Sequence, residues 1–125
     1  MGLIIVTVLA IFLKNQKNKN ANVKIPILLY HDFVETVPDS DPDNFSYINT
    51  PQSYDENIKT LLENGYKFIS FQELYDANNG KIELPEKPIL VTLDDGYYSN
   101  YEYIFPILKK YNVKASIFIV TDKIG

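Results

Sequence analysis

Two acidic residues stand side by side where a buried strand is expected to end. Asp94 and Asp95 follow the apolar run "PILVTL" and precede Gly96. Two carboxylates a few ångströms apart repel each other, and a cation or a shared proton is the usual remedy. One acid could then bind a metal ion while the other acts as a general base beside it. The alternative is a surface turn, because Asp-Gly pairs are common turn residues.

Gly96 bears on whether the two acids can act together. Consecutive side chains of a regular strand point to opposite faces, so both carboxylates reach one pocket only if the strand breaks at Asp95. A glycine in the next position supplies such a break. A catalytic zinc site usually has three protein ligands and one open position, whereas this sequence holds a single histidine, His31, and no cysteine. We therefore expect the remaining ligands to come from outside this chain.

Other polar residues also follow predicted strands. His31 comes directly after "KIPILLY", Ser70 closes "KFIS", and Thr121 and Asp122 follow "SIFIV". Ligands and catalytic groups collect at the carboxyl ends of the strands in parallel α/β folds. This position favours a functional role for His31, although a lone histidine is more often a structural hydrogen-bonding residue.

Two tyrosines follow the acid pair directly. Tyr97 and Tyr98 could form the wall of a sugar site by stacking against the ring. The sequence contains 10 tyrosines in all. Packing in the core or on the surface therefore remains the alternative for this pair.

Strands and helices alternate along the chain. Four strands are predicted, at residues 24–30, 67–70, 88–93 and 116–120. Helices between them are predicted from the N-cap Thr50 to Gly65, from Ser70 to the Asn78–Gly80 stop, and from Ser99 to Tyr111. The order βαβαβαβ implies parallel strands joined by right-handed helical crossovers, in a doubly wound sheet or a barrel.

Finer features of these elements are also predicted. The first strand is apolar without alternation, which is typical of a strand covered on both faces. The second helix is expected to turn Phe71, Leu74 and Tyr75 inward. In the third helix, Pro106 predicts a kink or a late start.

Composition restricts the class of partner. With 16 acidic and 12 basic side chains the net charge is −4, and no basic patch marks a nucleic-acid partner. The absence of cysteine excludes disulfides, thiolate zinc sites and a cysteine nucleophile. The length of 125 residues suits one domain or part of one.

The amino terminus differs from the rest of the chain. Leu3 to Leu13 is apolar except for Thr7, and a Lys/Asn-rich linker follows. Eleven residues are too short to span a bilayer, which needs about 20. We predict a signal or anchor segment over residues 1–13, a linker over 14–23 and a domain over 24–125, with a buried strand as the alternative for the first segment. The acidic stretch 37–43 is predicted to be a loop.

The run "VTLDDGYYSNYEYIFPILKKYNVKASIFIV" resembles the first catalytic motif of the polysaccharide deacetylases, the NodB-homology family. That motif is typically Thr-Phe-Asp-Asp-Gly, then a helix with Pro-x-Leu, then a strand beginning Ala-Thr-Phe-Phe. Residues 92–96 and 115–118 correspond to its two ends, with Leu93 in place of Phe. Upstream, "IPILLYHDF" and "LLENGYKFISFQEL" are similar to the branch that includes poly-N-acetylglucosamine deacetylases.

This resemblance implies the amino-terminal half of a distorted (β/α) barrel with parallel strands. It also implies a divalent metal, commonly zinc, and hydrolysis of acetyl groups from N-acetylated or O-acetylated sugars of a cell-surface or cell-wall polysaccharide. Asp94 corresponds to the catalytic base and Asp95 to the carboxylate metal ligand. His31 is expected at the pocket in contact with substrate, and Tyr97 is a second candidate for that contact. An extracellular or surface-attached protein is implied.

The sequence also departs from the family pattern. The two metal-binding histidines of the family, and its later Arg, Asp and His motifs, have no counterpart in these 125 residues. The prediction is an incomplete domain that is inactive and binds metal weakly by itself. One alternative is a non-catalytic carbohydrate-binding or cell-surface protein of the same fold. A magnesium-dependent phosphoryl-transfer domain is a weaker one, because its paired acids follow the first strand.

Overall fold

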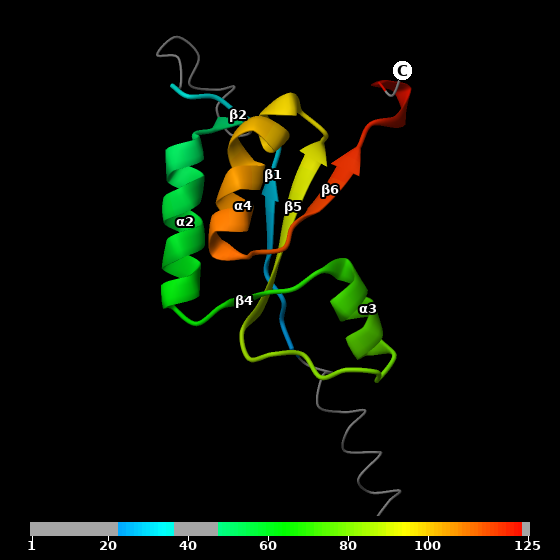
Figure 1. The fold of residues 1–125 in the computed structure, drawn as a ribbon. Helices are drawn as coiled ribbons and strands as arrows, with labels where there is room; N and C mark the ends of the chain where they lie inside the picture. Colours follow the sequence, from blue (N-terminus) through cyan, green and yellow to red (C-terminus); the bar gives the residue numbers. More distant parts are fainter. Residues whose placement is uncertain (1–22, 37–47, 124–125) are drawn as a thin grey trace, which may run out of the picture.

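The computed structural model describes residues 23–36 and 48–123 (Figure 1). The predicted apolar segment 1–13, the linker as far as residue 22 and the predicted loop 37–43 lie outside the described residues. None of the helices in the described ranges combines the length and the apolar character that a bilayer crossing needs.

The strand β5 (Pro88–Asp95) is the centre of the sheet. Its first six residues are all buried and are mostly the apolar and β-branched types that favour strands. Three strands pair with it in parallel: β4 (Lys67–Phe68) at its first two residues, β1 (Ile27–Tyr30) in the middle and β6 (Ser116–Ile119) at its last four. The predicted parallel arrangement is confirmed.

Two helical segments cover one face of this sheet. In Figure 1, α2 (Pro51–Glu63) and α4 (Phe105–Tyr111) lie side by side, and the π-helical turn η2 (Asn100–Ile104) leads into α4. A single cluster of buried side chains joins the sheet to these helices. Its members are Tyr30, Phe33, Tyr54, Ile58, Val91, Leu93 and Ile104.

The predicted helix starts of α2 and α3 (Phe71–Asn78) are confirmed. The Thr50 side chain accepts a hydrogen bond from the Ser53 amide at 3.1 Å. The Ser70 hydroxyl accepts one from the Glu73 amide at 3.2 Å, while the Glu73 carboxylate accepts the Ser70 amide at 2.7 Å. Each reciprocal pair satisfies amides that a helix leaves without partners at its start.

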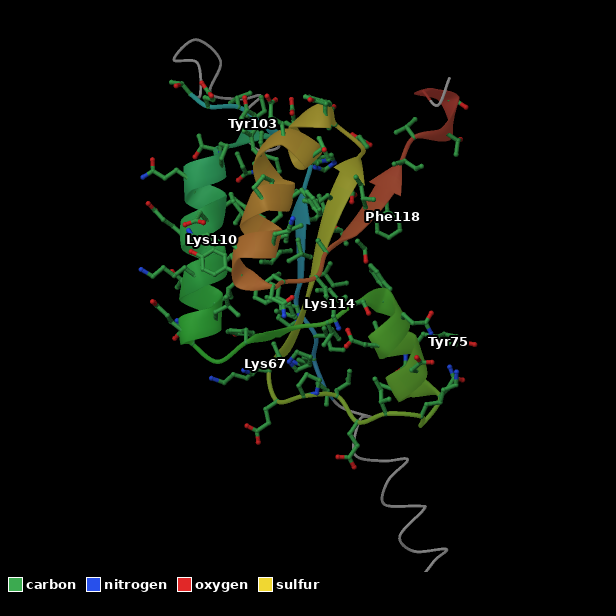
Figure 2. The ribbon with its side chains drawn as sticks, viewed as in Figure 1. Lys67, Tyr75, Tyr103, Lys110, Lys114 and Phe118 are labelled. Carbon is green, nitrogen blue, oxygen red and sulfur yellow. The ribbon has the colours of Figure 1, made fainter. Side chains whose placement is uncertain are left out.

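The predicted inward face of α3 is wrong for two of its three residues. Phe71 is 37% exposed and Tyr75 60% exposed, whereas Ala77 is the buried residue of this helix. Figure 2 shows Tyr75 projecting from α3 on the side away from the sheet. The helix lies apart from α2 and α4 (Figure 1), so only a narrow side of it meets other described residues.

The prediction that the first strand is covered on both faces is also wrong among the described residues. Leu28 and Tyr30 pack on the core cluster. Ile27 and Leu29 are 53% and 55% exposed. The physical reason is that α2 and α4 cover one face of β1, and no described helix covers the other.

The third predicted helix divides into two parts. Residues 100–104 form the wider turn η2, and regular α-helix starts at Phe105, directly before Pro106. A proline has no amide hydrogen and its ring excludes the carbonyl of the preceding turn, so a regular α-helix cannot run through it undisturbed. Of the two expectations for Pro106, the late start of the α-helix is the one observed.

A pair of very short strands was not predicted. β2 (Asp32–Phe33) runs parallel to β3 (Ile48–Asn49). Two-residue strands carry no detectable alternation, so periodicity cannot reveal them. The pair places Phe33 in the core and makes His31 the single residue between β1 and β2.

Candidate active site

The central strand turns sharply at the acid pair. Asp95 has φ of +69° and Gly96 has φ of +71°. Left-handed backbone is unfavourable for most residues with a side chain, although aspartate is among those that tolerate it best. The predicted break of the strand at Asp95 is thus confirmed, even though pairing with β6 continues to this residue.

Asp94 is half-buried on the face of β5 opposite the core cluster. Its Oδ1 atom is buried and has no hydrogen-bond partner among the described residues. Thr92, two residues earlier and therefore on the same face, also has a buried hydroxyl without such a partner. A buried carboxylate oxygen requires a proton, a donor or a cation. A cation bound next to this oxygen would meet that requirement.

The described residues do not supply a complete metal site. No group of three or more acidic or histidine side chains in 23–36 and 48–123 is arranged to hold an ion. Asp95 is exposed beside the half-buried Asp94. The two carboxylates, one of which has a buried oxygen without a hydrogen-bond partner among the described residues, match part of a metal site. The roles of Asp94 as base and of Asp95 as metal ligand stay predictions.

The structure brings His31 to the same level of the sheet as Asp94. Tyr30 is in register with Leu93 of β5, so His31 and Asp94 are the next residues on neighbouring strands. His31 is half-buried at this position. The expected convergence of His31 with the acid pair therefore holds at the level of the strand ends.

Two other strand-end candidates are placed differently. The Ser70 hydroxyl donates to the Glu73 carboxylate at 2.9 Å and caps α3, which accounts for this residue structurally. Because β4 pairs with the first two residues of β5, Ser70 also lies well below the acid pair. Asp122 is exposed in the short 3₁₀ turn η3 (Thr121–Lys123) that follows β6.

The two tyrosines that follow the acid pair line an apolar pocket. This pocket has a volume of about 390 Å³ and lies between β5, β6 and the η2–α4 segment. Its wall includes Leu93, which belongs to the core face of β5, whereas Asp94 points to the other face. Tyr97 is 41% exposed there. A contact of Tyr97 with substrate stays a prediction.

One contact in this region, between Asp32 and Ser99, was not predicted from the sequence. The Ser99 hydroxyl donates to Asp32 Oδ1 at 2.7 Å, and the Phe33 amide donates to the same oxygen at 2.8 Å. The Phe33 amide also reaches the Ser99 oxygen at 3.2 Å. We call this set of contacts the Asp32–Ser99 clamp. The available signal was the position of Asp32 next to His31 in "YHDF", but Ser99 lies 67 positions away.

Burial affects the tyrosines beneath this site. Tyr30, Phe33 and Tyr54 form an aromatic cluster in which the Tyr30 and Tyr54 rings meet edge to face at 4.9 Å. Desolvation raises the pKa of Tyr30 and raises that of Tyr54 far more. Both phenols therefore stay neutral and act as packing groups under the β1 end of the sheet.

Comparison with known proteins agrees with the motif. The sequence model of the polysaccharide deacetylase family matches residues 81–125. A poly-β-1,6-N-acetyl-D-glucosamine N-deacetylase of Staphylococcus aureus is 33% identical over 81 residues, which are 64% of this chain and 27% of that protein. The enzyme of the same name from Escherichia coli is 43% identical over 60 residues, 48% of this chain and 9% of the other.

The fold agrees as well. A solved de-N-acetylase from Aggregatibacter actinomycetemcomitans superposes with a TM-score of 0.67 at 35% identity, covering 74% of this chain and 36% of that one. The chain spans about a third or less of the length of the curated relatives it matches. The shared motif, the parallel strands and these similarities agree with one another: residues 81–125 match the polysaccharide deacetylase model, and the chain is similar in sequence and fold to part of the domain of these deacetylases.

Proposed function

We propose that the protein containing this chain is a metal-dependent hydrolase that removes acetyl groups from the N-acetylated sugars of a cell-surface polysaccharide. O-acetylated sugars are the alternative substrate for the same chemistry. The observation that carries the proposal is the acid pair at the turn of β5, where Asp94 presents a buried, unpartnered oxygen.

The two acids would have different roles, one as metal ligand and the other as general base. Asp95, exposed at the end of β5, would hold a divalent ion, which we propose to be zinc, together with ligands outside this chain. When bound, such an ion supplies a Lewis acid and lowers the pKa of the attacking water. Asp94 would take the proton of that water at its carboxylate, because its buried Oδ1 atom has no hydrogen-bond donor among the described residues and can accept.

The substrate class is proposed from the names of two relatives and from the neighbours of the acid pair. Two relatives are named as poly-β-1,6-N-acetyl-D-glucosamine N-deacetylases. We extend this to N-acetylhexosamine polymers for the present chain. His31 stands level with Asp94 and would contact the sugar, and Tyr97 is the second candidate for such a contact.

The cellular place is also part of the proposal. Residues 1–13 would direct export or attach the protein to a membrane, residues 14–23 would be a linker, and the catalytic domain would start at residue 24. The apolar run from Leu3 to Leu13 supports this division. Fractionation of cells tests it: recovery of the full-length protein in the cytosol would contradict an extracellular or surface location.

Two substitutions test the catalytic assignments in the protein encoded by the complete reading frame that contains this chain. Asp95→Ala is expected to abolish zinc binding in calorimetric titration. Asp94→Asn is expected to leave zinc affinity within about threefold and to lower acetate release from poly-N-acetylglucosamine at least 100-fold, the usual size of a general-base contribution.

The same experiment contains its controls. Asp122→Asn removes an exposed acid after β6 and should change neither quantity. An active Asp94→Asn variant would refute its role as the base. A wild-type protein that binds the polymer without releasing acetate would support instead a non-catalytic carbohydrate-binding protein.

A further inference from the structure

We propose that Asp32 is a positioning residue of this site: through the Asp32–Ser99 clamp it fixes His31 relative to Asp94. The inference rests on the proposed function, because it assigns to His31 the sugar contact described above. Asp32 itself touches neither sugar nor metal in this assignment.

The clamp joins the two loops that carry the candidate site. Asp32 is the residue after His31, and Ser99 is the third residue after Gly96. A single oxygen, Asp32 Oδ1, accepts both the Ser99 hydroxyl at 2.7 Å and the Phe33 amide at 2.8 Å. In Figure 1, β2 lies beside the turn that follows β5. The end of β1 and the end of β5 are thus connected by charge-assisted hydrogen bonds above the sheet.

The behaviour of Ser99 distinguishes the clamp from an ordinary helix cap. A serine at the start of a helix normally accepts a hydrogen bond from an amide of the first turn. Ser99 directly precedes η2, but its backbone is already helical (φ −55°, ψ −28°), and its side chain makes no capping bond. Its hydroxyl is directed instead to a carboxylate 67 positions away. The Ser99 hydroxyl therefore connects two distant loops and has no capping role at η2.

Neighbouring contacts hold the clamp on its β2 side. Phe33 is 2% exposed and belongs to the core cluster, so the backbone that carries Asp32 is anchored. The Val34 amide donates to the Asn49 carbonyl at 3.0 Å, which ties β2 to β3. His31 lies between this anchored segment and β1. Movement of His31 toward or away from Asp94 is therefore restricted on both sides.

Steady-state kinetics separate positioning from stability. A variant that merely unfolds more easily contains fewer active molecules, so its apparent kcat falls while KM is unchanged. A variant that lets His31 move loses substrate binding, so its KM rises. In the protein of the complete reading frame, Asp32→Ala is expected to raise KM about tenfold, which corresponds to about 1.4 kcal/mol. Ser99→Ala should raise it less, because the Phe33 amide still reaches Asp32.

Conservative and control variants accompany these two. Asp32→Asn retains the oxygen acceptor and Ser99→Thr retains the hydroxyl, so both should restore KM to within about twofold of the wild type. Ser70→Ala is the matched control: it breaks a serine-to-acid contact at the start of α3, away from His31. It should lower stability without raising KM. An unchanged KM in both Asp32→Ala and Ser99→Ala would overturn the inference.

A spectroscopic measurement decides the matter independently of activity. In the protein of the complete reading frame, the NMR signals of the His31 ring are assigned as those that are lost in His31→Gln. Ser99→Ala should shift these signals, while Ser99→Thr and Ser70→Ala should leave them in place. If the wild type of the complete reading frame releases no acetate, the proposed function fails and this measurement still tests the clamp. His31 signals that do not respond to Ser99→Ala would overturn it.

Discussion

At the scale of single residues, Gly96 has a packing role as well as a backbone role. A Cβ atom placed at Gly96 would lie 2.9 Å from Ile119 Cγ2, which is closer than real Cβ atoms approach other carbons. Its φ of +71° is also unfavourable for a residue with a side chain. The break after the acid pair and the approach of β6 therefore depend on the same glycine.

Gly96→Ala is expected to destabilise the chain by about 2–3 kcal/mol, from a left-handed backbone cost of about 1–2 kcal/mol and a local contact that must relax. Gly80→Ala is the matched control, because Gly80 has φ of +70° and open space around it. Urea unfolding measures both variants. In an Ile119→Ala background, the loss of unfolding free energy caused by Gly96→Ala should fall to that of Gly80→Ala. If the two glycine substitutions cost the same in the wild-type background, the contact between Gly96 and Ile119 would have no energetic effect.

At the scale of secondary-structure elements, polar contacts centred on Asp55 join α2 and α4 at their surface. Lys110 Nζ lies 2.8 Å from Asp55 Oδ1 and 3.1 Å from Oδ2. The Tyr111 hydroxyl donates to Asp55 Oδ2 at 3.1 Å. Figure 2 shows Lys110 between the two helices. The hydrogen bond from Lys110, assisted by Tyr111, lowers the pKa of the Asp55 carboxyl.

The sign of this shift predicts a pH dependence. A carboxyl whose pKa is lower in the folded state stabilises the fold above its unfolded pKa of about 4, and this contribution is lost as pH falls through the folded value. The contact is solvent-exposed in part, so its size should be below about 1 kcal/mol. We expect the free energy of unfolding to fall less in Asp55→Asn than in the wild type as the pH is lowered from about 5 to about 2.

Glu56→Gln serves as the control for this measurement, since Glu56 is an exposed acid on the same helix that contacts Gln52 instead of a lysine. Its pH dependence should equal that of the wild type. If the free energy of unfolding of Asp55→Asn changed with pH as it does in the wild type, the contact of Asp55 with α4 would contribute nothing to stability.

At the scale of the whole molecule, the described residues leave apolar surface open on the sheet. Five side chains of β1 and β6 are 53–56% exposed. They are Ile27, Leu29, Ile117, Phe118 and Ile119. In Figure 2, Phe118 projects from β6, and its ring meets Phe71 edge to face at 5.8 Å. Exposed apolar strands of this kind are sites of association.

The 125-residue chain by itself is therefore expected to self-associate at micromolar concentration and to bind a hydrophobic dye. Phe118→Lys should weaken both properties, because a charge on β6 opposes edge-to-edge pairing. Tyr75→Lys is the control, since Tyr75 is 60% exposed on α3 and away from the sheet. Gel filtration over a concentration series measures the association. A soluble monomer with a sharp, cooperative melt would contradict this expectation.

The sequence by itself determined the elements that rest on local chemistry and on pattern. The caps at Thr50 and Ser70, the parallel order of strands and helices, and the position of Asp94 and Asp95 at the end of β5 all follow from residues close together in the chain. Hydrogen bonds in a cap and the burial of an apolar run depend on near neighbours, so short segments carry enough information to predict them.

The tertiary structure alone decided features that join distant residues. The open face of β1, the exposure of Tyr75, the pairing of β2 with β3 and the Asp32–Ser99 clamp depend on what lies opposite in space. The burial of a side chain and the partner of a hydroxyl are properties of the folded surroundings, and no local pattern encodes the approach of residue 99 to residue 32. The place of His31 near the acid pair was expected from its position at a strand end, while the register of β1 with β5 set it level with Asp94.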